Sequence, residues 1–302
     1  MESGLLLIDK AEGPTSSRVV QRVKAILGAK KVGHLGSLDP FASGLLLLGV
    51  NEGTKIAQLF LTAPKSYTGT LALGVETDTQ DRTGRVLRVA DVPPLDDGDL
   101  ERLSHAFTGV LWQLPPMFSA LKKGGVPLYR LARQGKIIER AKRQVKIDHL
   151  RLWKLGKDEI GFEVSCSKGT YIRTLAADMG HDLGCGGHLK SLRRISCGAL
   201  KIDQAITLED LKTLWDQGKA PMVPLVEALG DIPRFSLSPS GVARLRAGRQ
   251  DVLAELGNRE AEWGVAGLLD GSGNLVALAG WTDADRGGKW QLLRVFAPPS
   301  GF

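Results

Sequence analysis

Hydrophobic positions at the start of the chain follow two patterns, an unbroken run and a run at helical spacing. Residues 5–8 are all aliphatic, which predicts a short buried strand. Apolar residues in the segment 19–27 recur every three or four positions and predict a helix. Thr15 or Ser16 can cap the start of this helix, and Gly28 suits the position just after its end.

Alternation of apolar and polar positions predicts strands further along, at residues 67–74, 160–166 and 189–197. Residues 85–89 are expected to pair with the strand 67–74 as a hairpin, and the acidic loop 76–84 between them is expected to be a surface turn. Helices are predicted over about residues 56–61, 99–107, 128–134, 172–183 and 208–217. The first two thirds of the chain should therefore form an α+β domain.

The last part of the chain has a different composition. Residues 218–233 contain three prolines and are expected to be a linker. A short helix is predicted at 239–246, and three strands separated by glycine turns are predicted at 263–269, 275–281 and 290–296. Two domains are therefore expected: a large one over residues 1–225 and a small, mainly β one over residues 233–302.

Charge is concentrated in one segment. The chain carries a net charge of +7, but residues 121–154 hold eleven Lys or Arg against two acids, so the remainder sums to −2. A basic stripe confined to one region is typical of a nucleic-acid binder. A solvated basic face without a partner is the alternative.

Several classes of protein are disfavoured by what the sequence lacks. No apolar run approaches the roughly 20 residues that span a bilayer, and the start Met-Glu-Ser-Gly has no basic signal, so a soluble, cytoplasmic monomer is expected. Three cysteines cannot form a disulfide framework. Cys185 and His188 have a ligand-like spacing, but paired Cys-x-x-Cys clusters are absent, so no metal site is expected. Phosphate-loop and dinucleotide motifs are also missing, which argues against ATP or NAD as a cofactor.

The segment 33–46 holds the most distinctive chemistry. It combines three glycines, His34, Asp39 and Pro40 just before the apolar run 45–50, which predicts a strand. Glycine admits positive φ, and Pro40 keeps Asp39 out of the α region, so the carboxylate sits on a shaped loop. Such a loop can present a catalytic acid. Taken alone, the segment is better explained as a polar turn in which Asp39 bonds its own backbone.

Several ordered motifs resemble one family. They are Leu7-Ile8-Asp9-Lys10, Gly33-His34 to Gly44, Gly53-Thr54-Lys55, Lys65-Ser66-Tyr67, Thr77-Asp78-Thr79-Gln80-Asp81, Gln113 to Lys122, Cys166 to Leu175, and His188 to Arg194. In this order the sequence resembles the TruB-type tRNA pseudouridine-55 synthases. The C-terminal part resembles, more weakly, the PUA-like RNA-binding domain that such proteins often carry.

The resemblance implies roles for individual residues. Asp39 would be the catalytic nucleophile, Tyr67 would pack on the target base, and Arg173 would pair with Asp39. The substrate would also contact His34, Tyr171, Leu192 and Lys55. A basic RNA clamp over about residues 112–145 would include Lys122, Lys123, Arg133, Arg140, Lys142 and Arg143. The implied partner is the T stem-loop of tRNA, and the implied fold is a mixed, largely antiparallel sheet with a PUA-like domain.

The chemistry of this reaction fits a site without a cofactor. Uridine becomes its C-glycoside when the N1–C1′ bond breaks, the base rotates and the bond re-forms through C5, with no redox change. A carboxylate can add to C6 of the base or attack C1′, and a neighbouring Arg173 would favour its ionised form. Both routes stay open. Because the base must leave its stack, an aromatic platform such as Tyr67 is expected.

Two other hypotheses remain. The same scaffold could serve a non-catalytic RNA-binding or tRNA-folding protein, in which the basic segment matters and Asp39 does not. A relative that works with a guide RNA inside a ribonucleoprotein is disfavoured, because the sequence has no long charged tails.

Overall fold

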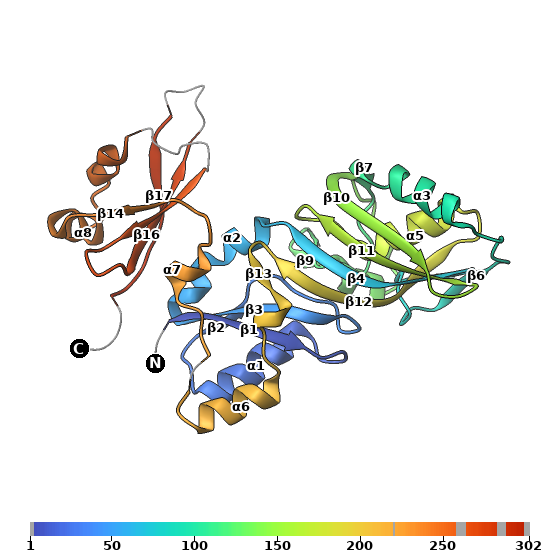
Figure 1. Ribbon diagram of the computed structural model, residues 1–302, viewed down its shortest axis with the longest axis horizontal. Coiled ribbons are helices and arrows are strands. Elements are labelled where there is room, and N and C mark those ends of the chain that lie inside the picture. The colour runs from blue at the N-terminus through green and yellow to red at the C-terminus, as the bar shows by residue number, and fades with distance from the viewer. Residues whose placement is uncertain (1–2, 220, 258–263, 283–287, 299–302) are drawn as a thin grey trace.

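One large sheet organises the computed structural model, which describes residues 3–219, 221–257, 264–282 and 288–298. The sheet has nine strands, seven of them in the order β1-β3-β12-β4-β11-β10-β7 (Figure 1). These are β1 Gly4–Lys10, β3 Ser43–Val50, β12 Gly187–Cys197, β4 Lys65–Leu73, β11 Glu159–Cys166, β10 Arg143–Lys154 and β7 Gly109–Gln113. β2 Val32–His34 pairs with β3, and β13 Leu200–Lys201 pairs with β12. Only β12 and β3 run parallel, so the predicted mixed, largely antiparallel sheet is confirmed.

Helices cover the sheet at both ends. The predicted capped helix is α1 Ser16–Leu27: the Thr15 side chain accepts from the backbone N of Arg18, and Gly28 ends the helix with a φ of 60°. It packs against α6 Leu208–Asp216 beside β1, where Thr207 and Asp210 form a capping box. At the far end, α5 Ile172–Asp182 packs on β12, and α3 Asp97–Ala106 packs on β10. The short helices η1 Asn51–Ile56 and α2 Ala57–Thr62 follow β3.

One predicted pairing is wrong. Residues 85–89 were expected to form a hairpin with the strand 67–74, but β6 Val86–Val89 pairs with β5 Val75–Thr77 instead. β4 has no free edge for β6, because β11 and β12 occupy its two sides. The two-stranded ribbon β5–β6 therefore extends beyond the main sheet.

The prediction that residues 218–233 form a linker is also wrong. The stretch 218–233 contains the helix α7 Leu225–Ala228, and Val223 exchanges two backbone hydrogen bonds with Leu5 at 2.8 and 2.9 Å. Leu229 is buried. These residues extend the edge of the large sheet beside β1 and belong to its packing, which proline content alone did not indicate.

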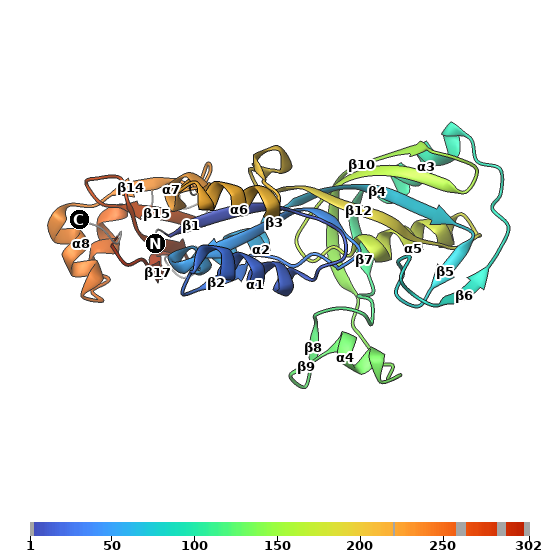
Figure 2. The ribbon, with the colours of Figure 1, turned by 90° about the horizontal axis from the view of Figure 1, so that it is seen from below.

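The segment between β7 and β10 projects away from the sheet (Figure 2). It carries the short elements β8 Lys122–Lys123, β9 Val126–Pro127 and α4 Leu128–Arg133. We call residues 114–142 the projecting segment. Both ends of the predicted clamp, residues 112–113 and 143–145, belong instead to strands of the large sheet.

The C-terminal part forms its own small sheet, in the order β14-β15-β16-β17. Its elements are β14 Arg234–Ser236, α8 Pro239–Arg246, η3 Asp251–Leu256, β15 Val265–Leu269, β16 Leu275–Trp281 and β17 Trp290–Val295. The predicted strands are therefore present, although Trp263 lies outside the described residues. Leu278 and Phe296 join a buried cluster with Leu5 and Leu47 of the large sheet, so the two sheets share an apolar contact. The domain limits and the PUA-like assignment stay predictions.

Candidate active site

Asp39 lies on the loop between β2 and β3, as its motif predicted. The loop is shaped by glycine: Gly36 and Gly44 have φ values of 140° and 97°. A Cβ on Gly44 would collide with the backbone of Arg194 on β12, so only glycine lets the loop approach the sheet so closely. The side chain of Asp39 is 42% exposed, which leaves it open to a substrate.

Arg173, near the start of α5, pairs with Asp39. Its Nε lies 2.9 Å from Oδ2 of Asp39, and its Nη1 lies 3.6 Å from Oδ2 of a second carboxylate, Asp81. Nη1 and Nη2 also donate to the carbonyl oxygens of Thr79 and Phe118, both at 2.8 Å. The Arg173 side chain is only 7% exposed. A planar guanidinium held on all sides in this way cannot turn away from Asp39.

Asp81 is the main surprise of the site. The loop 76–84 was expected to be a surface turn, and for Asp81 this is wrong, because the residue is 4% exposed. Its Oδ1 accepts from the hydroxyls of Thr79 and Thr83 at 2.8 and 2.6 Å and from the backbone N of Thr83 at 2.9 Å. These bonds fix the turn whose carbonyl holds Arg173.

Tyr67 enters the same space from β4. Burial, opposed in part by the charge of Arg194, raises the pKa of Tyr67 to about 12. The phenol is therefore neutral at physiological pH. A neutral aromatic ring beside a carboxylate suits contact with the face of a base better than it suits proton abstraction.

Arg194, on β12, is a residue to which the sequence assigned no role. It is 3% exposed, and its Nε donates to the Leu45 carbonyl at 2.7 Å, while Nη1 and Nη2 reach the carbonyl oxygens of Ser37 and Gly36 at 3.4 and 3.3 Å. It thus binds both ends of the loop that carries Asp39. In the sequence, Arg194 is an arginine within a predicted strand, a position that ordinarily indicates a solvent-facing residue. It is buried only because another segment covers it.

Gln113 is a second residue that sequence reasoning did not assign. It is 2% exposed, and its amide accepts from the backbone N of Tyr171 at 3.0 Å and donates to the Tyr171 carbonyl at 3.3 Å. Tyr171 precedes α5 and has no side-chain cap. Gln113 therefore fixes the segment that leads into Arg173.

Asp39, Arg173, Asp81 and Tyr67 line one cavity of about 710 Å³, which we call the Asp39 cavity. Its lining includes six residues predicted for the catalytic or substrate site, namely His34, Asp39, Tyr67, Tyr171, Arg173 and Leu192, together with Arg133 from the predicted clamp. Burial raises the pKa of Tyr171. Partial desolvation at the cavity wall and the charge of Arg194 lower the pKa of His34, which favours its neutral ring.

Lys55 is not among the residues that line the Asp39 cavity. Its Nζ binds Glu52 at 2.6 Å and the Val295 carbonyl at 2.8 Å, and it lies 5.9 Å from the centre of the Phe296 ring. Glu52 in turn accepts from the backbone N of Ala297 at 2.8 Å. This placement connects Lys55 to the C-terminal sheet and gives no support to its predicted contact with the substrate.

The predicted RNA-binding cations are distributed along and beside the projecting segment. Lys122 and Lys123 are exposed on β8, and the Arg133 guanidinium lies 5.7 Å from the Tyr129 ring centre. Arg140 donates to the Pro115 carbonyl at 3.1 Å. The last two of the set are Lys142, which ends the segment, and Arg143, which begins β10, and both are exposed.

In the parts of the chain that the structure describes, no three His, Cys, Asp or Glu side chains are grouped so that they could hold a metal ion. No helix among them has the length and apolar character needed to cross a membrane.

Comparisons with known proteins agree on one family. Residues 24–172 match the family model of the TruB family pseudouridylate synthase (N terminal domain), and residues 173–229 match that of the tRNA pseudouridylate synthase B C-terminal domain. A tRNA pseudouridine synthase B from Syntrophotalea carbinolica is 38% identical over 301 residues, covering 97% of this chain and 98% of the relative. One from Geobacter sulfurreducens is 46% identical over 255 residues, covering 82% and 84%.

Solved structures share the fold. A chain in the crystal structure of a Cbf5-Nop10-Gar1 complex superposes with a TM-score of 0.76 at 26% identity, covering 98% of this chain and 85% of that one.

Proposed function

The chain belongs to the TruB family of pseudouridylate synthases, and from this premise we propose that it converts uridine 55 in the T-arm loop of tRNA to pseudouridine, with Asp39 as the nucleophile. It is a tRNA pseudouridine synthase, like its curated relatives. The observation that carries the assignment of Asp39 is its ion pair with the buried Arg173, inside a cavity large enough for a nucleotide.

The geometry supports a nucleophile on three grounds. Asp39 is partly exposed at the cavity, whereas Asp81, the other carboxylate near Arg173, is buried and already accepts three hydrogen bonds. Arg173 orients the Asp39 carboxylate and stabilises its charge. Attack at C1′ displaces N1 directly, whereas addition to C6 is followed by cleavage of the N1–C1′ bond. On either route the C5–C1′ bond forms, C5 loses its proton and the carboxylate is released, so the isomerisation needs no redox partner and no cofactor.

The target base would lie against Tyr67 and Leu192. A uridine in the T loop must be flipped out to reach Asp39, and this costs a few kcal/mol. Apolar contact with the Tyr67 ring and with Leu192 in the Asp39 cavity offsets part of that cost. The exposed His34 would hold the loop from which the base has left.

The basic residues would supply the remaining binding energy. The projecting segment presents Lys122, Lys123, Arg133, Arg140 and Lys142, and Arg143 follows at its base. Contacts from these cations to phosphates of the T stem would release counterions, so affinity should fall steeply as salt is raised. We further propose that the enzyme acts as a monomer, because one chain supplies every residue of the site.

The test is Asp39→Asn, with Asp91→Asn as a matched control at an exposed position outside the Asp39 cavity. Pseudouridine is mapped on tRNA after incubation with each variant, and tRNA affinity is measured in parallel. We expect Asp39→Asn to bind tRNA but to form no pseudouridine, while Asp91→Asn behaves as the wild type. Near-normal product from Asp39→Asn would reject Asp39 as the nucleophile.

A further inference from the structure

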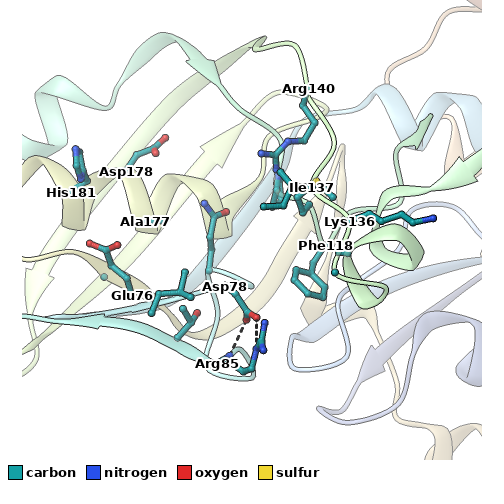
Figure 3. Close-up of a pocket in the computed structure, with 18 residues that line it drawn as sticks. Glu76, Asp78, Arg85, Phe118, Lys136, Ile137, Arg140, Ala177, Asp178 and His181 are labelled. Atoms are coloured by element: carbon teal, nitrogen blue, oxygen red, sulfur yellow. Dashed lines mark hydrogen bonds and ion pairs between the residues drawn. The ribbon is translucent and has the colours of Figure 1, made fainter. Parts of the chain in front are cut away.

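The walls of the Asp39 cavity come from several parts of the chain. At one wall, Phe118 also lines a second cavity of about 600 Å³, between the ribbon β5–β6, α5 and the projecting segment (Figure 3). At another wall lies the start of α1, where Ser16 lines the Asp39 cavity. The proposed mechanism gives α1 no task, although this helix begins beside the nucleophile.

Ser16 joins α1 to the loop that carries Asp39. The residue is 4% exposed, and its hydroxyl makes two hydrogen bonds to Leu38, the residue directly before Asp39. Its Oγ accepts from the backbone N of Leu38 at 2.8 Å and donates to the carbonyl oxygen of Leu38 at 3.0 Å. A single side chain, 22 positions away in the sequence, therefore satisfies both backbone groups of Leu38.

The residue after Asp39 is held by the same part of the chain. The Pro40 carbonyl accepts from the backbone N of Gly13 at 2.8 Å and from Nζ of Lys10 at 3.3 Å. Gly13 lies in the turn before α1, where its φ of 106° is one that favours glycine. Both neighbours of Asp39 are thus fixed by residues 10–16, which lead from β1 into α1.

The helix α1 gives these contacts a rigid base, because its apolar face is buried in the main core. By contrast, the Asp39 side chain is 42% exposed and extends from a loop without regular structure. Arg173 holds one oxygen of the carboxylate at 2.9 Å, but this contact does not fix the backbone from which the carboxylate extends. The direction of the carboxylate therefore depends on how Leu38 and Pro40 are held.

We propose that Ser16 is a positioning residue for pseudouridine formation: through its two hydrogen bonds to Leu38, it sets the place of the Asp39 carboxylate relative to the uridine. This rests on the proposed function, because it takes Asp39 as the nucleophile. Ser16 acts through the backbone and not on the reacting atoms. Its loss should therefore slow the chemical step without weakening the binding of tRNA, since a displaced carboxylate loses rate and not RNA contacts.

The test compares Ser16→Ala with Ser16→Thr. Ser16→Ala removes the hydroxyl and with it both bonds to Leu38, whereas Ser16→Thr keeps the hydroxyl. We expect Ser16→Ala to slow single-turnover pseudouridine formation by about 10- to 100-fold, at an unchanged dissociation constant for tRNA. Ser16→Thr should regain most of this rate. A wild-type rate for Ser16→Ala would overturn the proposal, and so would a Ser16→Thr enzyme as slow as Ser16→Ala.

The control for stability is Thr207→Ala. Thr207 caps α6, which packs against α1, and its hydroxyl accepts from the backbone N of Asp210 at 3.0 Å, outside the Asp39 cavity. Losing this cap should destabilise the fold, as Ser16→Ala does, but should leave the rate unchanged. Urea unfolding shows that each variant is folded before its rate is measured. If Thr207→Ala is as slow as Ser16→Ala, general destabilisation explains the loss and the proposal fails.

Asp39→Asn, measured in the same assay, separates this proposal from the proposed function. Product from Asp39→Asn would reject Asp39 as the nucleophile, and with it the basis of the positioning role. An inactive Asp39→Asn together with a wild-type rate for Ser16→Ala would reject the positioning role alone.

Discussion

Replacing Arg194 by methionine removes the cation that holds the loop around Asp39. The guanidinium makes one short bond, to the Leu45 carbonyl at 2.7 Å, and two long ones, to Ser37 and Gly36 at 3.4 and 3.3 Å. Arg194 is 3% exposed, so water does not readily replace it. With about 1.5–3 kcal/mol for a bond from a charged donor and less for the long ones, the free energy of unfolding should fall by about 2–4 kcal/mol.

The rate of pseudouridine formation by Arg194→Met should fall by more than the loss of folding stability alone would cause. Asp39 is only two residues from Ser37, so a loop released from Arg194 displaces the carboxylate from its position beside Arg173. A displacement of about 1 Å can cost on the order of 100-fold in rate. We therefore expect single-turnover pseudouridine formation to slow by about 100-fold. The dissociation constant for tRNA should change little, because the phosphate contacts are proposed on the projecting segment.

Two further variants make this prediction specific. Arg193→Met, on the same strand, removes a half-exposed pair with Asp9 and should leave the rate unchanged, because such surface pairs contribute about 1 kcal/mol at most. Arg194→Lys keeps the charge but cannot reach three separate oxygens, so it should recover stability without recovering the rate. Urea unfolding measures the first quantity and single-turnover assays the second. Wild-type rates in a folded Arg194→Met enzyme would refute the reasoning.

Two other perturbations follow from buried charges. Asp81→Ala should slow single-turnover catalysis by about 100-fold while tRNA binding persists. The reason is that the turn that holds Arg173 through the Thr79 carbonyl loses its hydrogen bonds to Asp81. An unchanged rate would show that Arg173 needs no second carboxylate. For Lys10, burial lowers the pKa from 10.5 to about 8. Between these values the folded protein has released a proton that the unfolded chain keeps, so Lys10 should add about 2–3 kcal/mol of stability from pH 8 to pH 10.5. Urea unfolding across that range should show this contribution as the difference between the wild type and Lys10→Met; parallel pH profiles for the two proteins would contradict it.

The sequence predictions that the structure confirms, such as the helix starts, rest on local patterns of residues. The cap predicted at Thr15 accepts its backbone hydrogen bond, and Thr207 and Ser238 cap α6 and α8 in the same way, because a capping contact depends only on residues two or three positions away. The Asp39 loop was predicted for the same reason, since its glycines and Pro40 constrain the backbone locally. Ordered motifs then indicated which distant side chains belong together.

Strands and their pairing were harder to predict from the sequence. β10 escaped prediction because its apolar alternation changes phase: Val145 and Ile147 are followed by Leu150 and Leu152, and the register shifts between Ile147 and His149. A bulge inserts one residue, so a search for strict period two fails across it. The surrounding basic residues made the same stretch look like a solvated segment.

Buried polar residues were hidden for a different reason. Asp81, Gln113 and Arg194 lie in a turn, an edge strand and a central strand, where polar residues ordinarily face water. Gln113 and Arg194 are each buried by a segment distant in sequence that shares their hydrogen bonds, whereas Asp81 accepts hydrogen bonds within its own turn and pairs with the distant Arg173. Only the tertiary structure brings these partners together, so no local pattern could assign their roles.

Arg173 connects the catalytic loop to the segment that is proposed to meet RNA. The same guanidinium contacts Asp39, the Thr79 carbonyl and the Phe118 carbonyl, which come from three separate parts of the chain. Phe118 lies near the start of the projecting segment and lines the Asp39 cavity. A shift of that segment therefore acts on a hydrogen bond of the residue that orients the carboxylate. Because α5 anchors Arg173 in the core, both the position of the projecting segment and the orientation of the Asp39 carboxylate depend on the Arg173 side chain.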